Sequence, residues 1–317
     1  MTEPLIEVRD LGRDFTVRSR RGVFRRTTRV VHAVHDLSFE VGAGEMVGYI
    51  GPNGAGKSTT IKMLTGILVP TGGHVRVAGI EPSRHRRELA RRIGVVFGQR
   101  TSLWWDLPLR DSFDLLRRIY DIAPERYERN LQEYVELLDL GDLLDTPVRQ
   151  LSLGQRMRGD IAAALLHDPG ILFLDEPTIG LDVISKGRLR EFLRALNAER
   201  GTTLVLTTHD LQDIEALCDR VIVIDHGTAV FDGPLDKLRA TGGASRTLVV
   251  DLVDEADPIT VTGAEVVKVD GPRQWLSFPA EASAAPLVAQ VAAAYDVADL
   301  SIQEPEIEGV IRELYSR

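Results

Sequence analysis

The sequence contains little cysteine and no long hydrophobic run. Its 317 residues include a single cysteine, Cys218, so an internal disulfide is excluded and a reducing compartment such as the cytosol is expected. No apolar run approaches the ~18–20 residues that a helix needs to span a bilayer. The opening residues, MTEPLIEVRD, are acidic and mixed, unlike a secretory signal. We therefore expect any membrane role to come through a partner.

The sequence also lacks internal repeats and an excess of basic residues. Lysine and arginine number 38 against 47 aspartate and glutamate residues, which gives a formal net charge of −9. This balance argues against free nucleic acid as the main ligand, so no nucleic-acid partner is expected. Hydrophobic residues make up 44% of the chain and charged residues 27%, as in an ordinary folded protein. The length favours one large domain and a smaller one.

Short apolar runs alternate with helical patterns over most of the chain. The runs typical of buried strands cover 46–50, 171–175, 202–209 and 221–225. A helical pattern over 57–68 follows the first run, and another, ended by Gly201, precedes the third. Residues from about 102 to 168 are predicted to be mostly helical, because apolar side chains recur there with a helical period. The alternation predicts a largely parallel sheet covered by helices on both faces.

Two further regions flank this pattern. Near the N-terminus, 5–11 and 30–41 read as strands, and the six arginines of 18–29 predict an exposed loop inside a hairpin. We interpret that loop as solvated, with contact to acidic lipid headgroups as the alternative. A small-residue stretch at 239–246 predicts a linker, which separates domains 1–240 and 241–317. Three strand-like and two helix-like segments then predict a small α+β domain, whose role the sequence does not specify.

The stretch GPNGAGKST matches the P-loop pattern and lies between a predicted strand and a predicted helix. Its glycines let backbone N–H groups turn inward around phosphate oxygens. Lys57 is expected to reach the β- and γ-phosphates, and Ser58 to offer its hydroxyl to Mg²⁺. A chance glycine turn is the alternative, but the flanking strand and helix favour phosphate binding. The residues predicted to contact ATP here are Gly51, Pro52, Asn53, Gly54, Ala55, Gly56, Lys57, Ser58 and Thr59.

Two adjacent carboxylates follow the apolar strand at 171–175. Asp175 is positioned to hold magnesium through its water shell, and Glu176 to polarise the attacking water as a general base. The alternative is a simple acidic turn. Two neighbouring carboxylates at the end of a buried strand are costly without a cation, so we favour the functional interpretation.

Two polar residues follow other predicted strands. His209 ends the strand after the carboxylates, and parallel strands open onto one crevice, so it is expected to contact the γ-phosphate and orient the water. Gln99 follows another apolar strand and is expected to sense Mg²⁺ and the attacking water. Each would mean little alone, because a single polar residue at a strand end is usually structural.

The stretch LSLGQ at 151–155 has two interpretations. Ser152 and Gln155 form a capping box, which is sufficient to begin a helix that runs to 166. The same cap presents a helix N-terminus, flanked by Ser152 and Gly154, which is a second anion site. Because one nucleotide already binds at the P-loop, we expect this second site to close on the γ-phosphate of a neighbouring molecule's ATP.

Taken in order, these motifs closely resemble the nucleotide-binding subunit of ATP-binding-cassette (ABC) transporters, over about residues 4–236. The resemblance implies a P-loop NTPase fold with a mostly parallel core sheet, an antiparallel β subdomain and a helical subdomain carrying the signature. It implies the following roles: Walker A loop, 51–59; Q-loop, Gln99; signature, Ser152, Leu153, Gly154 and Gln155; Walker B, Asp175 and Glu176; D-loop, Asp182; switch histidine, His209. Phe15 matches the aromatic position that stacks on adenine. The family's usual signature is LSGGQ, and here Leu153 replaces the first glycine.

The resemblance also implies ligands and partners. These are ATP and Mg²⁺, integral-membrane permease subunits, and a second ATP-binding subunit, most simply an identical chain. The location implied is cytoplasmic, on the inner face of the cell membrane. Adjacent Trp104 and Trp105 cannot both face one core, so we expect one to be exposed, either as a socket for a membrane subunit's coupling helix or by ordinary packing.

The leading hypothesis is therefore an ATPase that couples ATP-driven, head-to-tail dimer closure to transport through separate membrane subunits. The C-terminal tail resembles that of the daunorubicin-resistance and viologen-exporter type, which favours export. The alternatives are a soluble ABC ATPase of the translation or DNA-repair type, a non-hydrolytic nucleotide-binding regulator, and the ATPase subunit of an importer. The cargo cannot be predicted from this chain, because selectivity lies in the membrane subunits.

Overall fold

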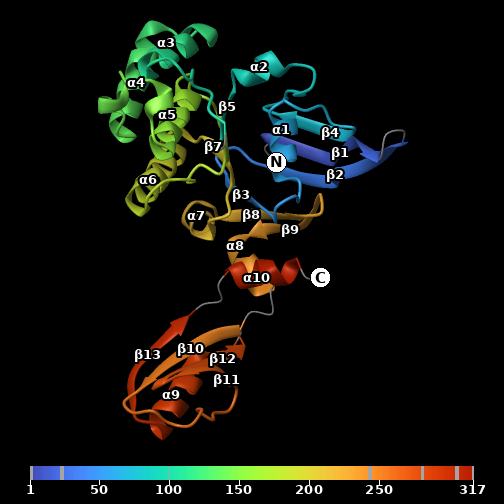
Figure 1. Ribbon diagram of the computed structural model, residues 1–317. Coiled ribbons are helices and arrows are strands. Elements are labelled where there is room, and N and C mark those ends of the chain that lie inside the picture. Colours follow the sequence, from blue (N-terminus) through green and yellow to red (C-terminus); the bar gives the residue numbers. More distant parts are fainter. Residues whose placement is uncertain are drawn as a thin grey trace. The chain divides into compact units, whose positions relative to one another are not determined.

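The computed structural model describes residues 3–21, 25–98, 100–241, 245–279, 282–303 and 307–315 (Figure 1). The chain divides into two compact units, Met1–Asp232 and Gly233–Arg317. The division falls before Gly233, where a short helix, α8 (Leu235–Thr241), begins the second unit after two residues. The domain boundary predicted from the sequence is 240/241, within the stretch 239–246. Residues 239–241 of that stretch belong to α8. Glycine and alanine content therefore marks a region near the boundary and not the boundary itself.

The first unit is built on a six-stranded sheet with the order β5-β6-β7-β3-β8-β9. Its strands are β3 (Met46–Ile50), β5 (Ile93–Phe97), β6 (Ile171–Asp175), β7 (Thr203–Thr207), β8 (Arg220–Asp225) and β9 (Thr228–Pro234). The pairs from β5 through β8 are all parallel. The predicted largely parallel core sheet is thus confirmed. Strands β3, β5, β6, β7 and β8 are buried over most of their residues, because both faces of the sheet are covered there.

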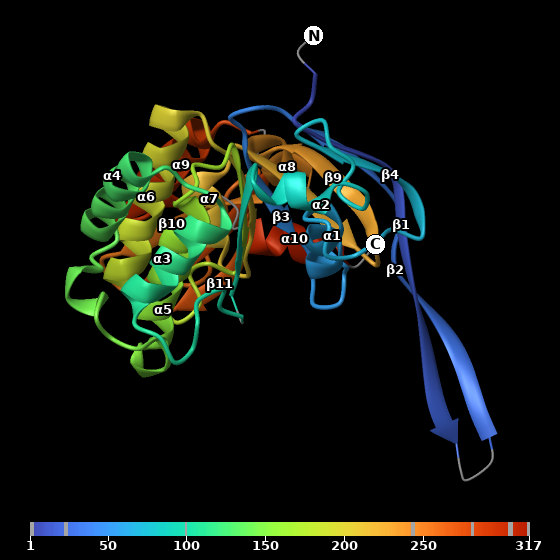
Figure 2. The ribbon, with the colours of Figure 1, turned by 90° about the horizontal axis from the view of Figure 1, so that it is seen from above.

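A three-stranded antiparallel sheet with the order β2-β1-β4 packs beside this core. It contains β1 (Ile6–Arg21), β2 (Arg25–Val41) and β4 (Gly72–Val77). The predicted exposed loop at 18–29 is wrong, because β1 and β2 remain paired as far as Arg21 and Arg25. Figure 2 shows this two-stranded ribbon extending well past β4. Each strand satisfies the backbone groups of the other, so the ribbon does not require the apolar residues whose absence suggested a loop.

The helices of the first unit include those that the sequence predicted and two short ones, α2 and α7, that it did not. They are α1 (Lys57–Leu64), α2 (Arg86–Ala90), α3 (Leu109–Ile119), α4 (Pro124–Leu137), α5 (Leu153–Leu165), α6 (Val183–Arg200) and α7 (Leu211–Leu217). Two short 3-10 turns, Gly141–Leu143 and Val148–Gln150, lie between α4 and α5. Helices α3, α4 and α5 gather on the side of the core sheet away from β1, β2 and β4 (Figures 1 and 2). None of the helices in the described part of the chain is both long and apolar enough to span a bilayer.

The second unit has its own core. An antiparallel sheet with the order β11-β12-β10-β13 is formed by β10 (Ser245–Leu252), β11 (Glu265–Asp270), β12 (Arg273–Pro279) and β13 (Val297–Gln303). Buried side chains of the sheet pack with Leu287 and Val291 of α9 (Ala284–Ala294). Two further helices, α8 and α10 (Ile307–Leu314), complete the predicted α+β composition. Strand β13 was not predicted, and most of its side chains are exposed.

Candidate functional site

The P-loop connects β3 to α1 and has a backbone that only glycine tolerates at two positions. Gly54 and Gly56 have φ values of 87° and 105°. A Cβ atom at Gly56 would lie 2.5 Å from the carbonyl oxygen of Ala33, so the loop leaves no space for a side chain there. The turn directs the chain into α1, whose free N-terminal N–H groups then face the loop.

Lys57 folds back over this loop. Its Nζ donates to the carbonyl oxygens of Gly51 at 2.5 Å and Pro52 at 3.1 Å. Burial lowers the pKa of the Lys57 ammonium, and the nearby carboxylates of Glu176 and Asp175 oppose that shift. The ammonium is therefore held beside the loop by backbone oxygens and two carboxylates, which is an arrangement suited to an incoming polyanion.

A cavity of about 490 Å³ opens over the P-loop. It is lined by Ala33, Pro52, Asn53, Gly54, Gly56, Lys57, Ser58, Thr59, Lys62, Ile67, Phe97, Gly98, Arg100, Asp175, Glu176 and His209. The structure thus brings most of the predicted P-loop residues together with both carboxylates and the histidine. Lys62 and Arg100 add two cationic residues that sequence reasoning missed, because neither belongs to the motif.

Asp175 ends β6 and lies between the P-loop helix and β7. Its Oδ2 accepts from Ser58 Oγ at 3.3 Å, and its Oδ1 accepts from Thr207 Oγ1 at 2.5 Å. Thr207 was also missed, although it pairs with Asp175 across the parallel ladder. Ser58 and Asp175 supply only oxygen donors, which Mg²⁺ prefers. No group of three or more His, Cys, Asp or Glu side chains in the described residues is arranged to hold a metal ion.

Glu176 and His209 form a close pair. Glu176 Oε1 lies 3.2 Å from His209 Nε2, and Oε2 accepts from the backbone N–H of His209 at 3.3 Å. The Glu176 backbone adopts φ 58°, a left-handed conformation that is costly for a residue with a side chain. Burial raises the pKa of the Glu176 carboxyl, and the adjacent His209 opposes the shift. A carboxyl with a raised pKa beside phosphate-binding groups is suited to act as a general base.

Four residues predicted for the nucleotide site are not among the described lining residues: Gly51, Ala55, Gln99 and Phe15. Gln99 lies outside the described residues, although its neighbours Gly98 and Arg100 line the cavity. Phe15 lies on β1, where the Arg13 guanidinium stacks over its ring at 4.8 Å, and it is not among the described lining residues. A role for Gln99 and for Phe15 therefore stays a prediction.

The signature stretch begins α5. Ser152 Oγ accepts from the Gln155 backbone N–H at 3.2 Å, and Gln155 Oε1 accepts from the Ser152 N–H at 2.9 Å, so the capping box forms as expected. None of the four signature residues lines the described P-loop cavity. This separation is what the two-molecule interpretation requires.

The D-loop lies against the signature. Leu153 is 37% exposed and covers Gly180, where an added Cβ would lie 2.5 Å from the Leu153 side chain. Asp182 caps α6: its Oδ1 accepts from the Ser185 N–H at 2.9 Å. That bond and the Ser185 hydroxyl lower the pKa of the Asp182 carboxyl. Leu153 thus packs on the D-loop of its own chain.

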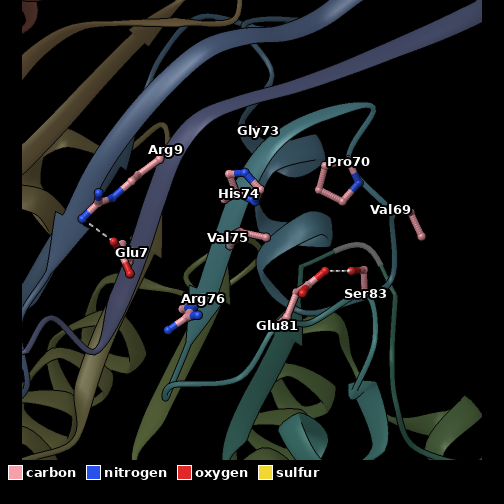
Figure 3. A pocket seen from close by; sticks show the side chains of 10 residues that line it. All are labelled: Glu7, Arg9, Val69, Pro70, Gly73, His74, Val75, Arg76, Glu81 and Ser83. Carbon is pink, nitrogen blue, oxygen red and sulfur yellow. Dashed lines mark hydrogen bonds and ion pairs between the residues drawn. The ribbon is translucent and has the colours of Figure 1, made fainter.

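A second cavity, of about 440 Å³, lies near β1 and β4 (Figure 3). Both of its glutamates have partners within the cavity lining: Arg9 is 2.5 Å from Glu7, and Ser83 Oγ donates to Glu81 at 3.0 Å. It contains none of the predicted site residues. The cavity over the P-loop is therefore the candidate functional site.

Tryptophan exposure differs from the expectation. Only one of the two adjacent tryptophans was expected to be exposed. Trp104 is 37% exposed and Trp105 is 50% exposed, so both reach the surface. The Arg156 guanidinium lies 5.4 Å from the Trp105 ring, which supports it from one side. Two adjacent residues can both be exposed here because they lie in a non-helical connection between β5 and α3.

The P-loop follows a parallel strand, and acidic and histidine side chains lie at the ends of neighbouring strands. This arrangement defines a P-loop nucleoside triphosphatase. The profile of the ABC transporter family matches residues 34–179. The daunorubicin resistance ATP-binding protein DrrA3 of Streptomyces coeruleorubidus is 34% identical over 290 residues, which cover 89% of this chain and 90% of that protein. The chain therefore belongs to the ABC transporter ATP-binding proteins.

Other similarities agree with this assignment. The Nod factor export ATP-binding protein I of Rhizobium sp. (strain N33) is 40% identical over 201 residues, which cover 63% of this chain and 65% of that protein. The solved dimer of the ATP-binding cassette MJ0796, in a post-hydrolysis state bound to ADP and Pi, is similar with a TM-score of 0.62 and 27% identity. That similarity covers 73% of this chain and 98% of the solved one. The ABC ATPase fold is thus confirmed.

Proposed function

We propose that this chain is the ATP-hydrolysing, energy-coupling subunit of an ABC exporter. The observation that carries the proposal is the Glu176–His209 pair beside the P-loop, with 3.2 Å between Glu176 Oε1 and His209 Nε2. The names of the relatives, which refer to drug resistance and to Nod factor export, favour export over import.

The chain's own residues supply the binding energy and orientation for ATP. Backbone N–H groups of 51–59 and the N-terminus of α1 surround the β- and γ-phosphates, and Lys57 exchanges its backbone contacts for phosphate oxygens. Mg²⁺, when bound by Ser58 and through water by Asp175, would neutralise phosphate charge. Thr207 holds the Asp175 carboxylate in place for this role.

Glu176 then acts as the general base. A water beside the γ-phosphate gives a proton to a Glu176 carboxylate oxygen as its own oxygen bonds to phosphorus. The bond from phosphorus to the β,γ-bridging oxygen breaks, and its electron pair leaves with ADP. His209, held against Glu176, orients the water and contacts the γ-phosphate.

The signature completes the site from a second chain. Ser152, Gly154 and the free N–H groups at the start of α5 form an anion site on the surface of one molecule. Two copies placed head to tail would each close this surface over the other's ATP, and hydrolysis would release the phosphate that joins them. We assign the second ATP-binding subunit to an identical chain.

The closing and opening of the two chains would be transmitted to membrane subunits. The exposed pair Trp104 and Trp105 follows the Q-loop region and offers an aromatic surface for a coupling helix of a permease. This contact would place the chain at the inner face of the cell membrane. Its cargo would be chosen by the permease.

The test is the rate of ATP hydrolysis in purified wild-type protein and in Glu176→Gln. Removing the base is expected to lower kcat by ~10²–10⁴-fold, because general-base catalysis contributes about that much. The dissociation constant for ATP is expected to change little, since the Glu176 carboxylate donates no hydrogen bond to the phosphates of ATP. Unchanged turnover in Glu176→Gln would overturn the role of this residue, and absence of turnover in the wild type would favour a non-hydrolytic regulator.

A further inference from the structure

A fully buried carboxylate lies behind the catalytic pair. Asp213 of α7 has 0% exposure, and it does not line the nucleotide cavity. Burying a charge is costly unless partners compensate for the lost hydration. The mechanism above does not use Asp213, so its partners indicate what it does.

Each oxygen of Asp213 has partners. Oδ2 accepts from Thr178 Oγ1 at 2.6 Å and lies 3.3 Å from the Oγ1 donor of Thr208. Oδ1 accepts from Arg190 Nε at 2.7 Å, and Arg190 Nη2 lies 2.5 Å from the same oxygen. Both threonines are buried. One carboxylate therefore holds two hydroxyls and a guanidinium that come from three separate segments.

The two threonines that Asp213 binds lie close in sequence to Glu176 and His209. Thr178 lies two residues after Glu176, on the segment that leaves β6, and Thr208 directly precedes His209, on the segment that leaves β7. Backbone pairing between β6 and β7 ends with the bond from the Glu176 N–H to the Thr207 carbonyl oxygen, at 2.9 Å, so the ladder does not reach Thr178 or Thr208. Asp213 connects these segments at the point where the ladder stops.

A second set of contacts fixes the histidine side. The Asp210 N–H donates to Thr208 Oγ1 at 3.0 Å, so this hydroxyl both accepts and donates. Asp210 Oδ2 in turn accepts from Lys186 Nζ at 2.6 Å. The backbone on both sides of His209 is thereby attached to buried or half-buried partners. These contacts restrict the movement of the imidazole relative to Glu176.

We propose that Asp213 is a positioning residue that sets the separation of Glu176 and His209 through the hydroxyls of Thr178 and Thr208. Asp213 does not touch the nucleotide. It holds Glu176 in its left-handed conformation, with φ 58°, and keeps His209 within hydrogen-bond distance of the carboxylate. The proposal rests on the proposed function, because it assigns a role within that same ATPase site.

The test removes one hydroxyl at nearly constant shape. Thr178→Val eliminates the 2.6 Å hydrogen bond to Asp213 and substitutes none of the residues that line the nucleotide cavity. We expect kcat to fall by about tenfold to hundredfold, since small displacements of catalytic groups have effects of this size. KM and the dissociation constant for ATP are expected to stay within about twofold, because the P-loop is untouched. Thr178→Ser restores the hydroxyl and is expected to recover kcat.

A matched control separates positioning from general loss of stability. Thr203 is also a fully buried threonine, and its hydroxyl accepts from the Gly44 N–H at 2.7 Å at the opposite end of β7. Thr203→Val is expected to lower the melting temperature and to leave kcat unchanged. Asp213→Asn provides a second variant, which is expected to lower kcat and to make Thr178→Val nearly silent when the two are combined.

The outcomes distinguish this proposal from the proposed function. If Thr178→Val keeps kcat within about twofold while Glu176→Gln is inactive, the positioning role is overturned and the ATPase assignment stands. Failure of Thr178→Ser to rescue, or an equal loss in Thr203→Val, would also overturn it. If Glu176→Gln keeps full turnover, the proposed function itself fails.

Discussion

At the scale of single residues, the structure explains why the site forms where it does. Asp175 and Glu176 are adjacent in sequence, but they meet different partners: Ser58 and Thr207 for the first, His209 for the second. The left-handed backbone at Glu176 separates the two side chains. One carboxylate is thereby available for a cation and the other for a proton, which is the division of labour that the proposed hydrolysis requires.

The raised pKa of Glu176 has a consequence for the pH dependence of hydrolysis. A general base must be deprotonated, so kcat/KM is expected to fall as the pH decreases through the pKa of Glu176 in the nucleotide-free protein. Because burial raises that pKa, the acidic limb should lie above pH 4.5, the value for an ordinary glutamate.

Measuring kcat/KM for ATP between pH 5 and pH 9 checks this prediction. Circular dichroism at each pH serves as the control for unfolding. A rate that stays constant down to the pH where the protein unfolds would contradict the assignment of Glu176 as the base.

At the scale of elements, the parallel strands and the periodic helices were predictable from sequence, because burial on both faces leaves an apolar pattern. The antiparallel ribbon at 18–29 was not, since its sequence is rich in arginine and does not alternate apolar with polar residues. Strand β13 was also missed, and most of its side chains are exposed. Site residues within motifs were predictable, whereas Thr207 and Asp213 act through spatial contacts between segments that are distant in sequence.

The capping box of α5 has a measurable role in stability. Ser152→Ala removes the acceptor for the Gln155 N–H, and such losses cost about 0.5–2 kcal/mol of unfolding free energy. Turnover is also expected to fall, because Ser152 is proposed to contact the partner's ATP. Ser283 is a matched control, since it caps α9 without a side-chain hydrogen bond.

Chemical denaturation and ATPase assays of both variants check this prediction. Ser283→Ala should leave the free energy of unfolding and the rate nearly unchanged. If Ser152→Ala loses stability and keeps its full rate of hydrolysis, the serine is only a helix cap and the signature role is wrong.

At the scale of the whole molecule, the account requires two chains for one active site. A head-to-tail pair combines the P-loop of one chain with the signature of the other, so defects in the two halves should complement each other. Lys57→Ala disables the P-loop, and Ser152→Arg blocks the signature surface. Each variant alone is expected to be inactive, while an equal mixture should recover roughly a quarter of the wild-type sites by random pairing.

The mixing experiment needs a check that mixed pairs form. Differently tagged chains, purified through both tags in sequence, provide it. Mixed pairs with no ATP hydrolysis would contradict the head-to-tail arrangement, and full activity of either variant alone would contradict the two-chain site.

The central claim is that this ATPase drives a separate membrane protein. The most direct measurement is purification of the tagged full-length chain from gently solubilised membranes of the source cell, with mass spectrometry of the stoichiometric partners. The account predicts a polytopic membrane subunit at a fixed ratio, which is reduced when Trp104 and Trp105 are both replaced by alanine. Recovery only from the soluble fraction, with ribosomal or DNA-repair proteins as partners, would contradict it.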